Sequence, residues 1–79
     1  MFGKFMEDKL SLFGKRLQFL RKQKGLSQEQ LGLSCGLDRT YISGVERGVR
    51  NISLLNILKL AESLEVEPAE LLKFSEPSK

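Results

Sequence analysis

The sequence has no histidine, no tryptophan and a single cysteine among its 79 residues. General acid–base catalysis near neutral pH usually depends on histidine, and a nucleophilic cysteine usually needs a histidine beside it. The lone Cys35 cannot form an internal disulfide, and without histidine it cannot build a zinc site. The ten carboxylates are scattered along the chain. These absences argue against an enzyme and against a metal or other cofactor, and no small-molecule ligand is expected.

Long hydrophobic runs are also missing, and none approaches the roughly 20 residues that span a bilayer. The first eight residues end in Glu7-Asp8, where a signal peptide would need its apolar stretch. We therefore expect a soluble, cytoplasmic protein with no membrane partner. A chain this short buries only about 60% of its unfolded surface, so it forms one marginal core that dimerisation would help to stabilise.

The charge of the chain is unevenly distributed. Residues 1–51 hold ten Lys/Arg against five Asp/Glu, a net charge of +5, and residues 52–79 hold three against five, a net charge of −2. A basic first part favours a polyanionic partner. An ordinary solvated surface is the alternative, and charge alone does not decide between them.

The hydrophobic period predicts an all-α domain of five helices. The apolar residues of the first helix recur at spacings of three and four: Leu10, Phe13, Leu17 and Leu20. Caps and glycine or proline breaks place the helices at about 8–24, 28–35, 39–47, 53–64 and 68–74. We expect residues 8–74 to form a single domain between flexible tails at 1–7 and 75–79.

The second and third of these helices are separated by only Gly36-Leu37-Asp38. A turn this short, holding a glycine between two helices, is typical of a helix-turn-helix. In that arrangement the second helix of the pair enters the major groove of DNA.

The helical wheel of residues 39–47 has an apolar inward side marked by Ile42 and Val45. The outward side is small, hydroxylic and cationic, and comprises Thr40, Ser43, Gly44 and Arg47. Arginine can donate two parallel hydrogen bonds to guanine, threonine and serine can bond to base edges, and a glycine lets backbone and base approach. We therefore expect base contacts from Arg39, Thr40 and Ser43.

Phosphate contacts are expected around this helix. Gln28 begins the preceding helix, where free backbone N–H groups and the helix dipole favour an anion. The alternative for Gln28 is that it only completes the helix cap. Arg47, Arg50 and Asn51 extend the same surface with contacts that set register rather than read sequence.

Three segments, LSQEQL at 26–31, GLDRTYIS at 36–43 and ERG at 46–48, resemble the Cro/cI-type (XRE) helix-turn-helix family of phage repressors. The resemblance covers about residues 12–73. The run from Leu37 to Arg47 is most similar to the controller proteins of bacterial restriction–modification systems. This implies a five-helix phage-repressor-like domain and a homodimeric transcriptional regulator that binds double-stranded DNA at an inverted repeat.

The resemblance also implies roles for individual residues. It assigns base contacts to Arg39, Thr40 and Ser43, and backbone contacts to Gln28, Tyr41, Arg47, Arg50 and Asn51. It pairs Arg21 with Glu46, which the wheel places near the buried side, where a carboxylate needs a cation. Tyr41 lies on the flank of its helix and has a second interpretation, packing against neighbouring helices.

The last apolar residues, Leu71, Leu72 and Phe74, close the core or bind a second copy of the chain. We favour a homodimer through the fourth and fifth helices. The alternative function is an antitoxin-like protein-interaction module that also binds DNA. A module of that kind would need a long extra segment to wrap its partner protein, and residues 75–79 are too short for one.

Overall fold

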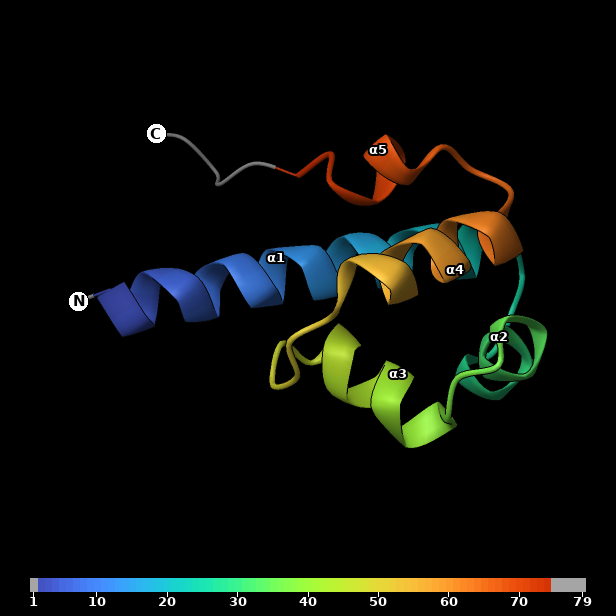
Figure 1. Cartoon of the computed structure of the whole chain (residues 1–79), viewed down its shortest axis with the longest axis horizontal. Helices are drawn as coiled ribbons and strands as arrows, with labels where there is room; N and C mark the ends of the chain where they lie inside the picture. Colours follow the sequence, from blue (N-terminus) through green and yellow to red (C-terminus); the bar gives the residue numbers. More distant parts are fainter. Residues whose placement is uncertain (1, 75–79) are drawn as a thin grey trace.

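The computed structural model describes the backbone of residues 2–74 and the side chains from Lys9 onward. Every regular element in that part of the chain is an α-helix, as the sequence predicted. The elements are α1 (Phe2–Gln23), α2 (Gln28–Cys35), α3 (Arg39–Glu46), α4 (Leu54–Leu64) and α5 (Pro68–Leu71). The long α1 runs through the molecule, with α2 and α3 on one side of it and α5 on the other (Figure 1).

The predicted bounds hold to within a residue or two for the middle helices and fail at the two ends. Helix α1 begins at Phe2 rather than near Asp8. The prediction missed the first turns because the apolar stripe that marks this helix starts only at Leu10. Helix α5 ends at Leu71 rather than at Phe74. Met1 and residues 75–79, assigned to the expected tails, lie outside the described residues.

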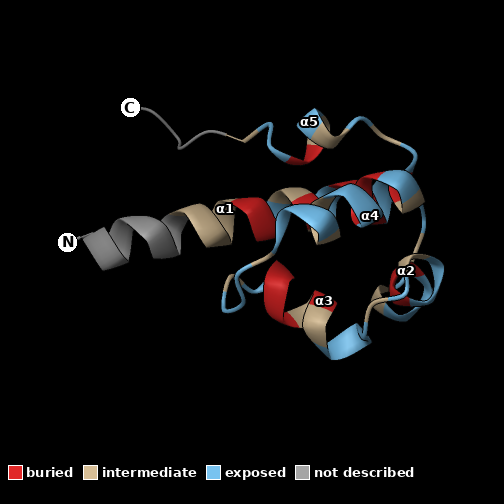
Figure 2. Cartoon of the chain, in the orientation of Figure 1, coloured by how far each residue is buried: buried red, intermediate tan, exposed pale blue. Residues whose placement is uncertain are grey.

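One hydrophobic core joins all five helices. Its buried side chains are Phe13, Leu17, Leu20, Leu31, Ile42, Val45, Leu60, Ala61, Leu64 and Leu71. The inward-facing parts of α1, α3 and α4 are the buried stretches in Figure 2. Helices α1 and α3 approach closely at Gly14, where a Cβ atom would lie 2.4 Å from the carbonyl oxygens of Val45 and Glu46. The third helix is thereby held against the long first one.

The short α5 and the segment after it are held against α1 by polar and aromatic contacts. Arg16 Nε donates to the Glu70 carbonyl oxygen over 2.7 Å, and its Nη2 donates to the Glu70 carboxylate over 3.0 Å. The Phe74 ring meets Phe13 edge-on, with ring centroids 6.3 Å apart. Arg16 is thus half-buried and paired with Glu70.

These contacts correct one of the three residues expected at a dimer interface. Leu71 is 0% exposed in the core of its own chain, so it closes the core rather than facing a partner. Phe74 is half-buried against Phe13. Leu72 remains exposed.

Candidate nucleic-acid interface

Helices α2 and α3 are joined by a tight, well-capped turn. The Ser27 hydroxyl accepts from the Gln30 backbone N–H, and the Gln30 side chain accepts from the Ser27 N–H, which completes a capping box. Gly36 ends α2 in the left-handed region with φ of +75°. Asp38 then caps α3 by accepting from the Thr40 N–H. Local chemistry therefore fixes where both helices begin and where the turn lies, and the arrangement is a helix-turn-helix.

A buried ion pair holds α3 against α1. Arg21 donates to Glu46 through Nε over 2.6 Å and through Nη2 over 3.0 Å, and the two residues are only 7% and 8% exposed. Arg21 Nη1 also donates to the Leu26 carbonyl oxygen over 2.7 Å. The pairing of Arg21 with Glu46 is the one the sequence indicated. It connects α1, the turn before α2 and the end of α3.

Gln28 joins the same network from α2. Its Nε2 donates to Glu46 Oε1 over 3.0 Å, and the side chain is half-buried. The sequence pointed to a phosphate contact or a part in the helix cap for this residue, and not to Glu46. A primary amide carries two hydrogens, so donation to Glu46 leaves one for a phosphate. Gln28 thus anchors the start of α2 to α3 in addition to the role expected of it.

The outward side of α3 is exposed at its start. Arg39 and Thr40 are exposed and Ser43 is half-buried. The Thr40 hydroxyl donates to the Asp38 carboxylate, so its polar group is engaged in the cap while the side chain still faces outward. Arg47 is exposed and its Nε donates weakly to the Ser43 hydroxyl, over 3.4 Å. Arg50 and Asn51, in the loop after α3, are exposed as well.

The structure corrects the expectation for Gly44 and favours the packing interpretation of Tyr41. Gly44 is buried, because the Arg50 side chain lies over it, so it is not an open approach for DNA. The Tyr41 hydroxyl accepts from Asn56 Nδ2 over 3.0 Å, and the Arg50 guanidinium lies 5.0 Å from the Tyr41 ring centroid. Gly44 and Tyr41 both contact Arg50, which lies in the loop after α3 and therefore does not appear on the helical wheel of α3.

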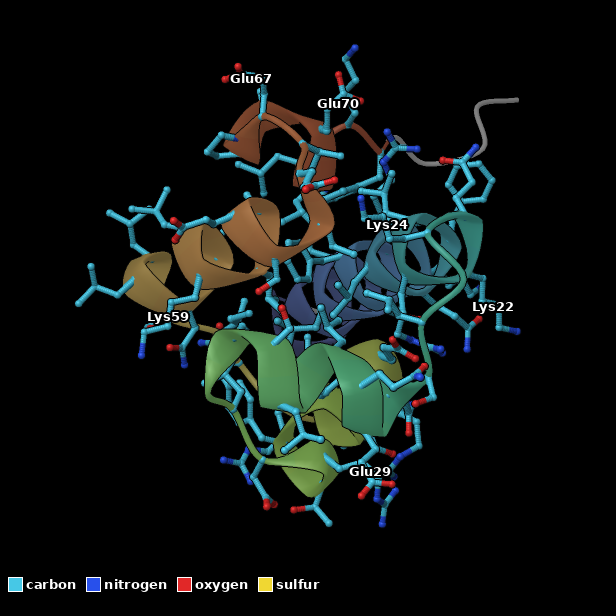
Figure 3. All side chains as sticks on the ribbon, turned by 90° about the vertical axis from the view of Figure 1, so that its right-hand side faces the viewer. Lys22, Lys24, Glu29, Lys59, Glu67 and Glu70 are labelled. Atoms are coloured by element: carbon cyan, nitrogen blue, oxygen red, sulfur yellow. The ribbon has the colours of Figure 1, made fainter. Side chains whose placement is uncertain are left out.

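Among the described side chains, the three arginines on and after α3 lack the ion pairs that four other cations of the fold make. Arg16, Arg21, Lys24 and Lys73 each pair with a glutamate. Across the part of the chain whose side chains are described, no salt bridge engages Arg39, Arg47 or Arg50. The acidic side chains Glu67, at the N-cap of α5, and Glu70 on α5 lie at the opposite end of the molecule from α2 and α3, whereas Glu29 lies on α2 (Figure 3). Within the described part of the chain, Arg39, Arg47 and Arg50 are therefore free to meet phosphates, as are the exposed Lys15 and Lys22 on α1 and Lys59 on α4.

Three leucines on α4 are a feature that sequence reasoning did not single out. Leu54 and Leu55 are each 69% exposed, and Leu58 is 41% exposed. The signal was present, because apolar residues occupy more of this helix than one core-facing stripe requires: Leu54, Leu55, Ile57, Leu58, Leu60, Ala61 and Leu64. We call Leu54, Leu55 and Leu58 the α4 leucine face.

The remaining chemistry of the described residues gives no catalytic centre. Cys35 is half-buried, and burial raises the pKa of its thiol, with weaker opposing effects from hydrogen bonds and from Lys59. A protonated, partly covered thiol is a poor nucleophile. Among the described side chains, from Lys9 to Phe74, no group of three potential metal ligands occurs, and none of the described helices is long and apolar enough to cross a membrane.

Comparison with known proteins agrees with this geometry. A helix-turn-helix family matches residues 17–71. The control protein C.BamHI of Bacillus amyloliquefaciens is 49% identical over 65 residues, which span 81% of this chain and 80% of that protein. The crystal structure of the restriction–modification controller protein C.AhdI of Aeromonas hydrophila has 63% identity and a TM-score of 0.78, over 78% of this chain and 94% of that one. The hypothetical transcription factor NHTF from Neisseria has 43% identity and a TM-score of 0.80, over 87% and 79% of the two chains.

The chain belongs to the helix-turn-helix family of Cro/cI (XRE) type, and its relatives include restriction–modification controller proteins. It is accordingly a DNA-binding transcriptional regulator and not an enzyme. The resemblance inferred from the sequence is confirmed.

Proposed function

We propose that this protein is a restriction–modification controller that binds an inverted-repeat operator in double-stranded DNA as a homodimer. The observation that carries the proposal is the set of exposed arginines on and after α3 without a salt-bridge partner, next to a helix-turn-helix whose relatives are controller proteins. A regulator of this kind works where the DNA is, so a cytoplasmic location is part of the proposal.

Base reading is assigned to Arg39, Thr40 and Ser43, at the start and on the outward side of α3. Phosphate contacts are assigned to Gln28, Arg47, Arg50 and Asn51. Tyr41 is also assigned a phosphate contact, because its hydroxyl accepts from Asn56 and still has its own hydrogen to donate to a phosphate. In the resulting complex α3 lies in the major groove and α2 crosses the backbone.

The homodimer is proposed to form through the α4 leucine face; Leu72, after α5, is also exposed and apolar. An exposed apolar cluster on a small domain is typical of a protein-binding surface. A single helix-turn-helix contacts few base pairs, and two copies reading half-sites about one helical turn apart supply the missing selectivity.

The Arg39→Ala substitution tests the base-reading assignment. It is expected to reduce discrimination at one base position of each half-site by about 1–3 kcal/mol, because arginine donates two hydrogen bonds to one guanine. The measurement compares affinities for the operator and for single-base variants of it. The matched control is Lys22→Ala, which removes an exposed cation of α1 and leaves α3 intact (Figure 3). An unchanged ratio of cognate to random binding for Arg39→Ala would show the assignment to be wrong.

A further inference from the structure

The chain reverses direction directly after α3. Gly48 has φ of +76°, the Val49 N–H donates to the Gly44 carbonyl oxygen, and the Gly48 N–H donates to that of Val45, each over 3.0 Å. These bonds end the helix in the manner of a Schellman motif. The residue that follows, Arg50, is thereby carried back over the side of α3.

Gly44 lies directly beneath the Arg50 side chain. A Cβ atom at position 44 would be 2.5 Å from Arg50 Cγ and 3.5 Å from both Cβ and Cδ of Arg50. Because Cγ is close to the backbone of Arg50, the side chain cannot relieve this contact by moving its tip alone. A glycine inside a helix is less favourable than an alanine. Here the Arg50 side chain passes so close to the backbone that it leaves no room for a Cβ atom at position 44, which explains the glycine.

Tyr41 supports the other end of the same side chain. The Arg50 guanidinium lies 5.0 Å from the centroid of the Tyr41 ring, within the range of a cation–π contact. The ring is itself fixed, since its hydroxyl accepts from Asn56 Nδ2 on α4 over 3.0 Å. Arg50 is therefore held along its stem by Gly44 and at its head by Tyr41.

We propose that Gly44, Tyr41 and Asn56 form a seat that orients Arg50 before DNA arrives, which makes them positioning residues for its phosphate contact. No salt bridge with a described residue neutralises Arg50, so its charge stays available while its conformation is restricted. An ordered arginine loses less rotamer freedom on binding than a free one. The DNA part of this inference rests on the proposed function.

The Gly44→Ala substitution is the test, because its new Cβ displaces the Arg50 stem and leaves every charge in place. With a mixed-sequence duplex as probe, both Gly44→Ala and Arg50→Ala are expected to weaken binding about tenfold, as one charge-assisted hydrogen bond is lost. Both are also expected to lower the slope of log affinity against log salt by about one. In the Arg50→Ala background Gly44→Ala should cause no further loss, since nothing remains for the Cβ to displace.

This double-mutant cycle separates the seat from the other use of a glycine on a DNA-facing helix, close approach of the backbone to the bases. If Gly44→Ala weakens DNA binding equally with and without the Arg50 side chain, the glycine allows close approach of the helix backbone to the bases, and the proposal of a seat for Arg50 is wrong. Far-UV circular dichroism shows whether each variant is folded, and an alanine at a helical position favours the helix.

A second measurement needs no DNA. Tyr41 is the single tyrosine of the sequence. Its ring is expected to shift the NMR signals of the nearby Arg50 side-chain protons, and these shifts can be followed in the free protein. We expect these protons to be shifted in the wild-type protein, and the shifts to disappear in both Gly44→Ala and Tyr41→Leu. Unshifted Arg50 protons in the wild-type protein would overturn the seat itself. Absence of duplex binding by the wild-type protein would instead overturn the proposed function and, with it, the phosphate role of Arg50.

Discussion

The Glu46→Ala substitution is expected to lower the free energy of unfolding by about 3–5 kcal/mol, the usual cost of leaving one member of a buried ion pair without its partner. Arg21 is almost fully covered and would keep only its bond to the Leu26 carbonyl oxygen. The same carboxylate also accepts from Gln28, so the start of α2 would lose its tie to α3. Urea denaturation at one fixed protein concentration measures the change, because dimerisation would otherwise shift the apparent stability.

The matched control for this experiment replaces both partners. The double substitution Arg21→Met with Glu46→Leu removes both charges and fills the space with apolar side chains, a change that is often neutral or stabilising. It should recover most of the stability lost by Glu46→Ala. A Glu46→Ala protein as stable as the wild type would contradict the account of the pair as the tie between α1 and α3.

The Leu55→Glu substitution is expected to convert the proposed homodimer into a monomer. It places a charge in the middle of the α4 leucine face, where Leu55 is 69% exposed and Leu54 and Leu58 are its neighbours. Because two linked half-site contacts bind far more tightly than one, affinity for the operator should fall about 100-fold or more. Sedimentation velocity measures the oligomeric state, and titration of the labelled operator measures the affinity.

Leu33→Glu is the control for Leu55→Glu. Leu33 is 79% exposed and lies on α2, so it is not part of the α4 leucine face. It should leave the oligomeric state unchanged. A Leu55→Glu protein that sediments as the wild type does would show that the interface lies elsewhere on the chain.

The parts of the fold that were predictable from the sequence are those fixed by neighbouring residues. Ser27, Asp38 and Ser53 each cap the helix that follows, and the bounds of α2, α3 and α4 agree with the expectation to within a residue. The inward positions of Ile42 and Val45 were likewise evident from the helical period. Caps and periodicity act over one or two turns, so a sequence displays them directly.

The parts that were not predictable depend on segments that meet in space. Gly44 was placed on the DNA-facing side because a helical wheel cannot show that Arg50 folds back over it. Gln28 was treated as a cap and phosphate ligand because nothing near it in the sequence reveals its contact with Glu46. Leu71 was assigned to a dimer interface because apolar character alone does not distinguish an internal partner from an external one.

The central claim is that this chain reads a specific sequence in DNA as a dimer, and selection of bound fragments from a random duplex library tests it most directly. We predict an enriched two-fold repeat whose half-site centres lie about one helical turn apart. That repeat would also be the operator for the Arg39→Ala and Leu55→Glu experiments. Retention of all sequences alike, weak and steeply dependent on salt, would mean that the exposed arginines act by charge alone and would contradict the claim.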